Sequence, residues 1–223
     1  MDTETGTFHR SLVTDLPPWD ADLRPLMVGN ACNLLICGQR KVGKSYLTSR
    51  ILTMLAEQGL ADLVILACGG SGPYSKPMAK YYDPRFCFRE CPEEIFNVIW
   101  RQQGELIAAG RKRSVVIIID DINMNSSARD AIITCALRGR HRSISLIQLC
   151  ISWTLAPKVY RRSVDAIFLF NLPLSSDKEC LSREYSSFHS WENTYFLIEN
   201  LEEHHCLVLI TIGGRVKMYD YIA

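Results

Sequence analysis

The chain has 223 residues, of which 48% are hydrophobic and 22% are charged, which suits one α/β domain with a substantial core. Its net charge of +1 excludes an overall electrostatic field that attracts nucleic acid, so any such contact must come from a local patch. Nine scattered cysteines without a C-x-x-C pair, no signal peptide and no bilayer-length apolar run argue against secretion and membrane insertion, so we expect reduced thiols in the cytoplasm or nucleus.

The sequence divides into an N-terminal lead-in, residues 1–29, and a single predicted domain, residues 30–223. Prolines at positions 17, 18 and 25 favour an extended segment that packs on a sheet. Within this segment, Trp19 either borders a nucleotide base or packs in the core, and core packing is the simpler interpretation.

The domain begins with a phosphate-binding motif. Asn33–Cys37 is short and mostly apolar, as expected of a buried strand, and Tyr46–Glu57 has the apolar spacing of a helix. Between them, Gly38–Ser45 reads G-x-x-x-x-G-K-S, the loop that cradles nucleoside triphosphates at a helix N-terminus. Lys44 is expected to reach the β- and γ-phosphates, and the Ser45 hydroxyl is expected to ligate Mg²⁺. The residues expected to contact ATP are Gly38, Gln39, Arg40, Lys41, Val42, Gly43, Lys44, Ser45 and Tyr46.

Two strands and a helix are predicted between this motif and the next. Leu63–Ala67 reads as a buried strand, 86–89 as a short edge strand, and 92–109 as a helix with acidic residues at its positive end. The glycine-rich loop that begins at Gly69 either faces substrate or is a plain surface loop. The basic turn Gly110–Arg113 is more typical of a solvated surface than of a DNA contact.

A second motif supplies carboxylates. Val115–Ile119 is a run of five β-branched residues, typical of a central parallel strand, and Asp120 and Asp121 follow it directly. Ligands bind at the carboxyl ends of such strands. Asp120 is therefore expected to hold Mg²⁺, directly or through water, and Asp121 to act as the base that polarises the attacking water.

The later elements continue the alternation and end in a β tail. A helix is predicted from Ser126 or Ser127 through Leu137, and the arginine-rich stretch Arg138–Arg142 after it is either a solvated turn or a phosphate contact. The remaining predicted elements are strands at 144–151 and 166–170, a helix or turn at 153–162, a helix from 175 to about 188, and tail strands at 195–198, 206–212 and 216–219, the last two joined by Gly213-Gly214. This order indicates a doubly wound, mostly parallel α/β sheet of the P-loop type with a C-terminal β hairpin.

Several classes of site can be compared on motifs. The chain has no N-K-x-D guanine reader and no L-S-G-G-Q signature, which argues against a GTPase and an ABC ATPase. A small-molecule nucleotide kinase stays open, with Arg138–Arg142 as its lid. A zinc site is a remote alternative, because the spacing of its five candidate ligands matches no standard finger. Those ligands are Cys87, Cys91, His204, His205 and Cys206.

Four features together resemble the viral genome-packaging ATPases of the FtsK–HerA superfamily, in particular the poxvirus-type, adintovirus and Polinton-like group. They are the phosphate loop, the Asp120-Asp121 pair, the stretch 138–145 and the stretch 152–170, and the resemblance covers roughly residues 30–172. The more discriminating steps are Gly139-Arg140-His141 and the proline at 157 followed by Arg161.

The resemblance implies an additional-strand, RecA/FtsK-like fold and an ATPase that forms a ring, a pentamer or hexamer, and drives double-stranded DNA into a capsid. It assigns catalytic roles to Lys44, Asp120 and Asp121, and it offers Arg140 and Arg161 as arginine fingers across a subunit interface, with Arg161 preferred. It also implies capsid portal or vertex proteins as partners, and a location in the host nucleus or cytoplasm or in the virion. The candidate pore loops are Gly69–Lys76 and Asn123–Arg129.

One position departs from the family. A glutamine that senses the γ-phosphate commonly stands just before the serine that Ser152 matches, whereas this chain has Ile151 there. Gln148 lies three residues earlier, and an odd shift along a strand predicts that its side chain points to the opposite face. Ser152 is a candidate substitute for the missing amide. A nucleotide-gated scaffold with little hydrolysis is therefore a second alternative.

Overall fold

The centre of the molecule is an eight-stranded sheet with the order β3-β2-β4-β5-β1-β6-β7-β8. The computed structural model describes residues 16–27, 31–69, 83–90, 93–111, 113–120, 122, 126–185, 191–212 and 215–222. The strands are β1 (Asn33–Cys37), β2 (Leu63–Cys68), β3 (Cys87–Phe88), β4 (Val115–Asp120), β5 (Ile144–Cys150), β6 (Ala166–Leu169), β7 (His205–Ile212) and β8 (Arg215–Ile222). β1 to β6 pair in parallel, and β7 and β8 continue the sheet as an antiparallel pair.

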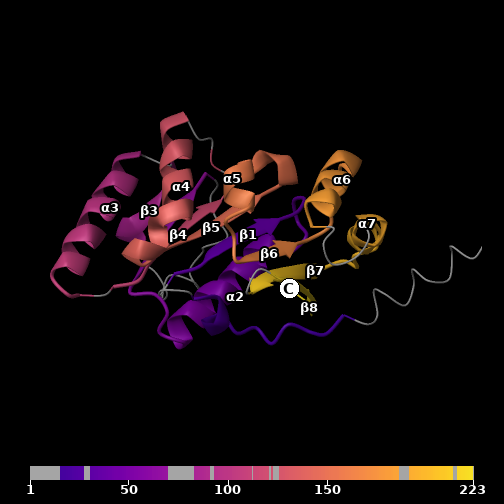
Figure 1. Ribbon diagram of the computed structural model, residues 1–223, viewed down its shortest axis with the longest axis horizontal. Coiled ribbons are helices and arrows are strands. Elements are labelled where there is room, and N and C mark those ends of the chain that lie inside the picture. Colours follow the sequence, from indigo (N-terminus) through magenta and orange to yellow (C-terminus); the bar gives the residue numbers. More distant parts are fainter. Residues whose placement is uncertain are drawn as a thin grey trace, which may run out of the picture.

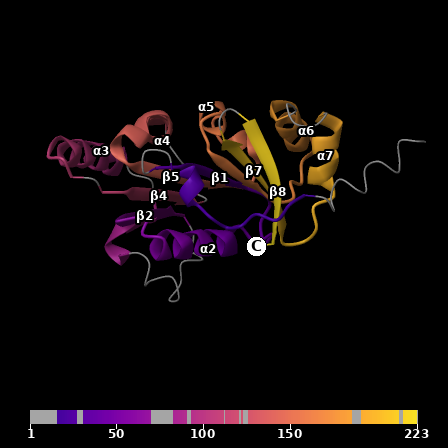
Figure 2. The same cartoon turned by 60° about the horizontal axis from the view of Figure 1, so that its bottom comes forward.

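Helices cover both faces of this sheet. α2 lies on one face, and α3, α4 and α5 lie on the other, while α6 and α7 pack together beyond β6 (Figures 1 and 2). The helices are α2 (Lys44–Glu57), α3 (Glu93–Ala108), α4 (Ser126–Arg138), α5 (Lys158–Arg161), α6 (Ser175–Glu184) and α7 (Trp191–Glu199), with short 3₁₀ turns η1 (Arg24–Leu26), η2 (Pro84–Phe86), η3 (Gly139–Arg142) and η4 (Trp153–Leu155). Within the described ranges, no helix is long and apolar enough to cross a membrane.

The two covered faces explain the apolar runs in the sequence. Every residue of β1, β5 and β6 is buried, and so is every residue of β4 before Asp120. Alternate residues point to opposite faces, so Leu35 and Ile117 join the core under α3 and α4, whereas Leu34 and Ile118 join the core under α2. Strands buried on both sides read as continuous apolar runs, as predicted.

The position of β5 defines the topology. β5 lies between β1, which leads into the phosphate loop, and β4, which ends in Asp120. All three strands run in the same direction, so the loop and the carboxylate meet at the same edge of the sheet. The predicted additional-strand, mostly parallel fold is confirmed, and so is the C-terminal hairpin of β7 and β8.

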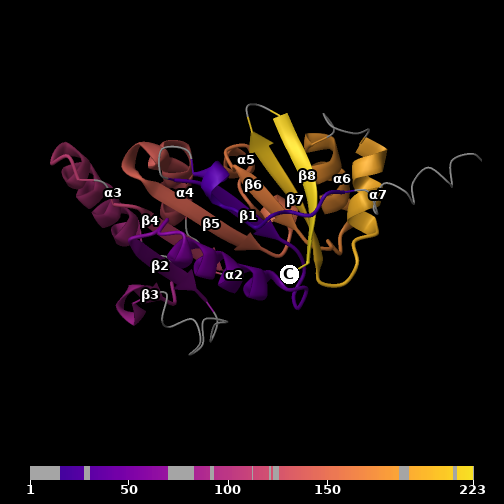
Figure 3. The same cartoon turned by 90° about the horizontal axis from the view of Figure 1, so that it is seen from below.

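The described part of the lead-in, 16–27, packs on the α2 face (Figure 3). Trp19 is 6% exposed, and its ring lies edge-on to those of Phe168 and Tyr221, with centroids 5.0 and 5.3 Å away. Pro18 forms a bridge with Asp220 of β8. Trp19 is therefore a core residue, as the simpler interpretation predicted, and it fastens the lead-in to β6 and β8.

The predicted strand at 195–198 is wrong, because these residues lie in α7. The local run Tyr195-Phe196-Leu197-Ile198 has the composition of a strand. In the folded chain, Thr194, Leu197 and Ile198 are buried together, which is a helical spacing, and α7 packs against α6. Tertiary packing therefore overrides a short apolar run that fits either structure.

Several boundaries differ from the prediction by a few residues. α2 begins at Lys44 rather than Tyr46, β5 ends at Cys150 rather than Ile151, and α6 ends at Glu184. The predicted helix or turn at 153–162 is two short pieces, and the predicted strand at 86–89 is only two residues long. Parts of the prediction lie outside the described residues. They are the candidate pore loop Gly69–Lys76 beyond Gly69, positions 123–125 of the second candidate pore loop, Asp121 and Gly213-Gly214.

The remote zinc alternative is wrong for the ligands that are described. Cys87 lies on β3 and Cys206 on β7, which stand near opposite ends of the sheet, so these thiols do not meet. Cys91 is outside the described residues, and among those described no group of three or more potential ligands gathers.

Candidate nucleotide-binding site

The phosphate loop crosses the carboxyl edge of the sheet between β1 and α2. The backbone N–H of Gly38 donates to the carbonyl of Cys150 at 3.1 Å, and that of Gln39 donates to Asn171 at 3.2 Å. These bonds fasten the loop to the ends of β5 and β6. A Cβ on Gly38 would lie 2.6 Å from Phe170 Cβ, so only glycine fits there. Gly43, with φ of 113°, makes the left-handed step into the helix.

Lys44 holds the loop together from within. Its ammonium donates to the carbonyl oxygens of Gly38 at 2.6 Å and Gln39 at 2.7 Å. The charge therefore lies inside the curve of the loop, next to the α2 N-terminus, where the helix dipole also favours an anion. Ser45 follows in the first turn of α2 and is partly exposed. This is the arrangement that a triphosphate requires of these two side chains.

A cavity of about 480 Å³ opens beside Lys44. Four polar side chains from four different elements line it: Lys44 of α2, Asp120 of β4, Arg129 of α4 and Gln148 of β5. The fold therefore brings together residues that are more than a hundred positions apart in the sequence. The remaining lining residues are Ile119, Ile122, Leu149, Cys150, Ile151 and Leu155.

Asp120 stands where the sequence placed it, at the carboxyl end of β4. Its Oδ2 accepts from the Cys68 thiol at 3.9 Å across the β2–β4 pair. A carboxylate opposite an ammonium across a cavity can hold a divalent cation between phosphate oxygens and protein. Asp121, the predicted base, lies outside the described residues, so its role stays a prediction.

Gln148 is the main correction at this site. The sequence predicted that it points away from the face of the sensor position, yet it lines the same cavity as Lys44 and Asp120. β5 ends at Cys150, so Ile151 is beyond the strand and the alternation of faces does not relate it to Gln148. The Oε1 of Gln148 is buried and has no hydrogen-bond partner among the described residues. A buried amide oxygen beside a cavity can accept a hydrogen bond from a water or a ligand donor in that cavity.

Replacing Gln148 with leucine tests whether this amide serves the ligand. The substitution removes an unsatisfied buried polar atom and keeps the volume close, so thermal stability should be unchanged or higher. If the amide positions a phosphate or the attacking water, kcat for ATP hydrolysis should fall by about 10²-fold. Thermal unfolding and steady-state hydrolysis measured on the same preparation check this, and equal kcat in both proteins would contradict it.

Arg129 is a site residue that the sequence did not identify as such. The predicted pore loop ended at this residue, whereas the structure places it in the first turns of α4, facing the cavity. It is exposed and shows no ion pair within the described part of the chain. Its only signal in the sequence was its position a few residues after the carboxylate-bearing strand. The guanidinium is available to a phosphate oxygen.

The Arg129→Ala variant should bind ATP about 10–100-fold more weakly, because a hydrogen bond from a charged donor contributes about 1.5–3 kcal/mol. The exposed Arg89, which follows β3, provides the matched control, and Arg89→Ala should bind as the parent does. Titration with a fluorescent ATP analogue gives both dissociation constants. Equal affinity in the parent and Arg129→Ala would remove Arg129 from the site.

Arg161, the preferred arginine finger, lies in the interior of its own subunit. Its side chain is 7% exposed, and its Nε and Nη2 donate to Glu184 at 3.1 and 2.8 Å. Its Nη1 donates to the carbonyls of Trp153 and Ala156. In this structure the guanidinium is committed to joining α5, η4 and α6, and it is not presented to a neighbouring subunit.

Arg140, the second candidate finger, lies at the other edge of the sheet. Its Nη2 pairs with Asp165, which precedes β6, and the other Asp165 oxygen accepts from the backbone N–H of Asn33 at 2.8 Å. Asn33 opens β1, so this cluster stands at the amino ends of the strands, opposite the cavity. Within one subunit, Arg140 therefore does not reach the cavity.

The Cys37 thiol at the end of β1 is chemically quiet. Cys37 and Cys150 are register neighbours on β1 and β5. The hydrogen bond to Cys150, together with burial, holds the pKa of the Cys37 thiol well above its usual range. Burial likewise raises the pKa of Cys32, at the opposite end of β1, to about 12. A thiol that stays protonated at neutral pH is a poor nucleophile and metal ligand, so neither of these two is a candidate for the chemistry of the site.

A second cavity, of about 300 Å³, lies on the other side of the phosphate loop. It is lined by 39–42 of the loop, Asn171 and the turn 201–205 before β7. The two cavities flank the same loop along the carboxyl edge of the sheet. An extended ligand that crosses the loop therefore has space at both ends.

No protein-family model and no curated protein sequence matches the chain. Solved structures do. The DNA-packaging ATPase B204 from Sulfolobus Turreted Icosahedral Virus is 18% identical, with a TM-score of 0.63 over 87% of this chain and 100% of that chain. The pCW3 conjugation coupling protein TcpA, in a structure of its monomer form with ATPγS, is 14% identical, with a TM-score of 0.65 over 93% of this chain and 70% of that chain.

EssC from Geobacillus thermodenitrificans, in a structure of its ATPases 2 and 3, is 13% identical, with a TM-score of 0.56 over 86% of this chain and 39% of that chain. B204 from Sulfolobus turreted icosahedral virus 2 has been solved with ATPγS and with AMPPCP. At these identities the likeness shows the fold. The fold that the resemblance implied is confirmed: the chain shares its fold with the DNA-packaging ATPase B204, the conjugation coupling protein TcpA and the ATPases of EssC.

Proposed function

We propose that this protein is an ATP-driven motor that moves double-stranded DNA and packages a viral genome into capsids. The observation that carries the proposal is the cavity in which Lys44, Asp120, Arg129 and Gln148 converge beside the phosphate loop. The match to the DNA-packaging ATPase B204 covers the whole length of that chain, which supports DNA as the proposed substrate.

In this proposal each group of the site has a separate role in ATP hydrolysis. The Lys44 ammonium and the loop N–H groups stabilise the charge that develops on the transferring phosphoryl group. Ser45 and Asp120 would hold a Mg²⁺ ion, which would supply further positive charge beside the phosphate oxygens. Asp121 orients the attacking water and accepts its proton. The Gln148 amide fixes the water or the γ-phosphate in line.

The two cavities support one direction for the bound nucleotide. In this proposal the γ-phosphate lies toward Asp120 and Gln148, and the nucleoside lies toward Asn171 and the turn 201–205 on the other side of the loop. The bond to be cleaved would then lie above β5, near Asp120.

The two alternatives predicted from the sequence lose their main support. The kinase alternative used Arg138–Arg142 as a lid, but this stretch lies at the amino ends of β5 and β6, away from the cavity. The scaffold alternative depended on the lack of a sensor amide, and Gln148 provides an amide in the cavity. A ring-shaped assembly, a pentamer or hexamer that docks on a capsid portal or vertex protein in the infected cell, completes the proposal.

Displacement of a triplex-forming strand tests movement along DNA. The purified protein with ATP should release a labelled third strand from a long duplex, whereas the Lys44→Ala variant should not. Protection of DNA from nuclease in the presence of empty capsids then tests packaging. A parent protein that hydrolyses ATP but releases no third strand would contradict the motor.

A further inference from the structure

The amino edge of the sheet, opposite the nucleotide cavity, carries a concentration of exposed arginines. Arg111 and Arg113 lead into β4, Arg138 ends α4, and Arg162 follows α5 before β6. All four side chains are exposed, and the exposed His141 of η3 lies among them. Within the described residues none of these five groups is in an ion pair. We call them the basic edge.

Two buried amides hold the segments of the basic edge side by side. Gln103 of α3 donates from one Nε2 to the carbonyls of Arg113 at 2.8 Å and Arg142 at 3.0 Å, which joins the lead into β4 to η3. Asn33 of β1 donates to the carbonyl of Ala136 at 2.8 Å and to that of Ser163 at 3.3 Å, which joins the end of α4 to the segment before β6. The basic runs are far apart in the sequence, and the fold makes them one surface.

Two further arginines support this surface from beneath. Arg142 lies over the Trp100 ring, 4.4 Å from its centroid, and donates to the Trp100 carbonyl at 2.6 Å. Arg140 pairs with Asp165, so the carboxylate at this edge is already neutralised. Asp62, at the start of β2, accepts from the Ser114 backbone N–H at 2.7 Å. The inner arginines hold the scaffold, and the outer ones face solvent.

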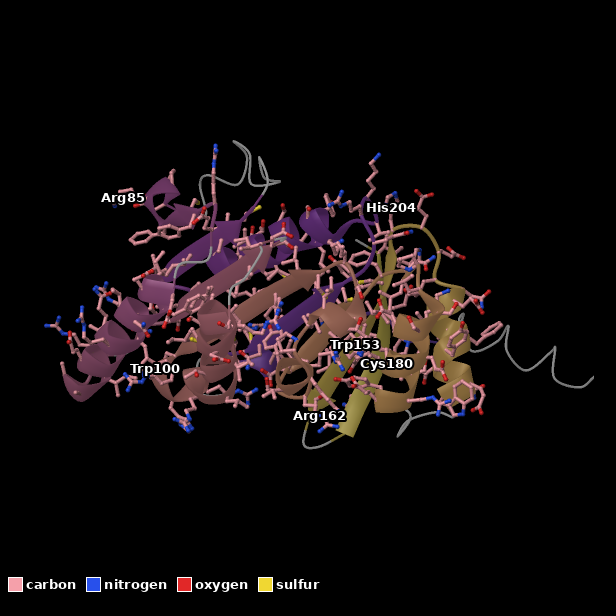
Figure 4. All side chains as sticks on the ribbon, turned by 90° about the horizontal axis from the view of Figure 1, so that it is seen from above. Arg85, Trp100, Trp153, Arg162, Cys180 and His204 are labelled. Atoms are coloured by element: carbon pink, nitrogen blue, oxygen red, sulfur yellow. The ribbon has the colours of Figure 1, made fainter. Side chains whose placement is uncertain are left out.

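The basic edge lies away from the nucleotide. Figure 4 shows Arg162 and Trp100 on one side of the molecule, and His204 and Arg85 on the other. His204 lines the cavity behind the phosphate loop. The arginines therefore belong to neither cavity of their own subunit, and their substitution leaves the residues around Lys44 in place.

The spacing fits an extended polyanion better than a single phosphate. From β4 through β5 and β1 to β6 the edge spans three inter-strand gaps of about 4.8 Å, or about 14 Å. Over that length a DNA duplex carries about eight backbone charges. An arginine finger for the nucleotide site of a neighbouring subunit needs only one arginine. Four arginines spread over three segments instead match the repeated phosphates of a DNA backbone. On a chain with a net charge of only +1, this is the local patch that nucleic acid requires.

We propose that the basic edge is the surface that binds the phosphate backbone of double-stranded DNA. This inference rests on the proposed function and names the contact surface for its substrate. The proposal also changes the interpretation of Gly110–Arg113, which the sequence alone suggested is a solvated turn. The sequence could not show that this turn lies near Arg138 and Arg162, because the fold brings them together. Binding through backbone charges is independent of sequence and sensitive to salt.

Fluorescence anisotropy with a labelled duplex of random sequence tests the surface. Three variants are compared with the parent without nucleotide, at salt concentrations from about 50 to 200 mM. One replaces Arg111, Arg113, Arg138 and Arg162 with alanine. The matched control pairs Arg85→Ala, on the far side in Figure 4, with Arg89→Ala just after β3. A basic-edge double variant, Arg138→Ala with Arg162→Ala, has the same net charge as this control.

The quadruple variant should bind DNA at least about 10-fold more weakly, and its plot of log K against log salt should be shallower by about 3.6, four contacts at about 0.9 each. The basic-edge double variant should show about half of that change in slope. The control variant should have the same slope and affinity as the parent. Equal DNA binding by the parent and the quadruple variant would overturn the inference.

Hydrolysis of ATP without DNA separates this inference from the proposed function. The quadruple variant should keep the parent's basal rate. If the variant loses that rate while it still binds DNA, the arginines act on a neighbour's nucleotide and the inference is wrong. If the parent itself does not hydrolyse ATP, the proposed function fails, and the anisotropy comparison still decides whether the basic edge binds DNA.

Discussion

Replacing Lys44 with alanine is expected to lower kcat for ATP hydrolysis by about 10²–10³-fold, the usual cost of removing one charge-stabilising donor from a transition state. Lys44 is the side chain that lies inside the loop, with its ammonium 2.6 Å from the Gly38 carbonyl and at the wall of the cavity that Asp120 also lines. Release of inorganic phosphate measures the change.

The ammonium also donates to two carbonyls of the loop, so the substitution removes bonds within the loop as well. Circular dichroism and thermal unfolding should show that Lys44→Ala is folded, because the loop N–H bonds to Cys150 and Asn171 remain. Lys158→Ala, on the exposed surface of α5, is the matched control and should keep the parent rate. A Lys44→Ala protein that is folded and hydrolyses ATP at the parent rate would show that the loop is not the catalytic phosphate site.

The second large effect is expected at Arg161, and it concerns stability. Arg161→Ala removes the cationic partner of the Glu184 carboxylate in a mostly buried site, and it removes the links to the Trp153 and Ala156 carbonyls. Breaking a buried pair from one side costs about 3–5 kcal/mol in the free energy of unfolding. For a chain of this length the melting temperature should fall by roughly 10 °C.

The neighbouring Arg162 makes a close control. It is exposed and has no ion pair with any described residue, so Arg162→Ala should change the free energy of unfolding by no more than about 0.5 kcal/mol. Thermal unfolding of both variants distinguishes a structural arginine from a finger. If Arg161→Ala melts with the parent while the assembled protein loses hydrolysis, the interior role is wrong and the finger role returns.

Local signals account for what the sequence predicted correctly. The phosphate loop, the strand before it and Asp120 at the end of β4 are defined by runs of fewer than ten residues, and each was found where expected. The parallel sheet followed from the alternation of buried strands and helices. Such features depend on neighbours in the chain, which a sequence displays directly.

The errors come from contacts between distant residues. Arg161 is buried because Glu184, 23 positions later, folds back onto it through α6. Gln148 and Ile151 line the same cavity because β5 stops at Cys150, so the alternation of faces along the strand does not extend to Ile151. α7 is a helix because α6 covers its apolar face. None of these contacts has a local pattern, so periodicity alone could not supply them.

The most direct test of the account is the steady-state rate of ATP hydrolysis by the purified, assembled protein with and without long double-stranded DNA, measured beside Lys44→Ala and Asp121→Asn. The account predicts that DNA raises the rate and that both substitutions abolish it. Binding of ATP without release of phosphate, whether or not DNA is present, would contradict the motor and favour a nucleotide-gated scaffold.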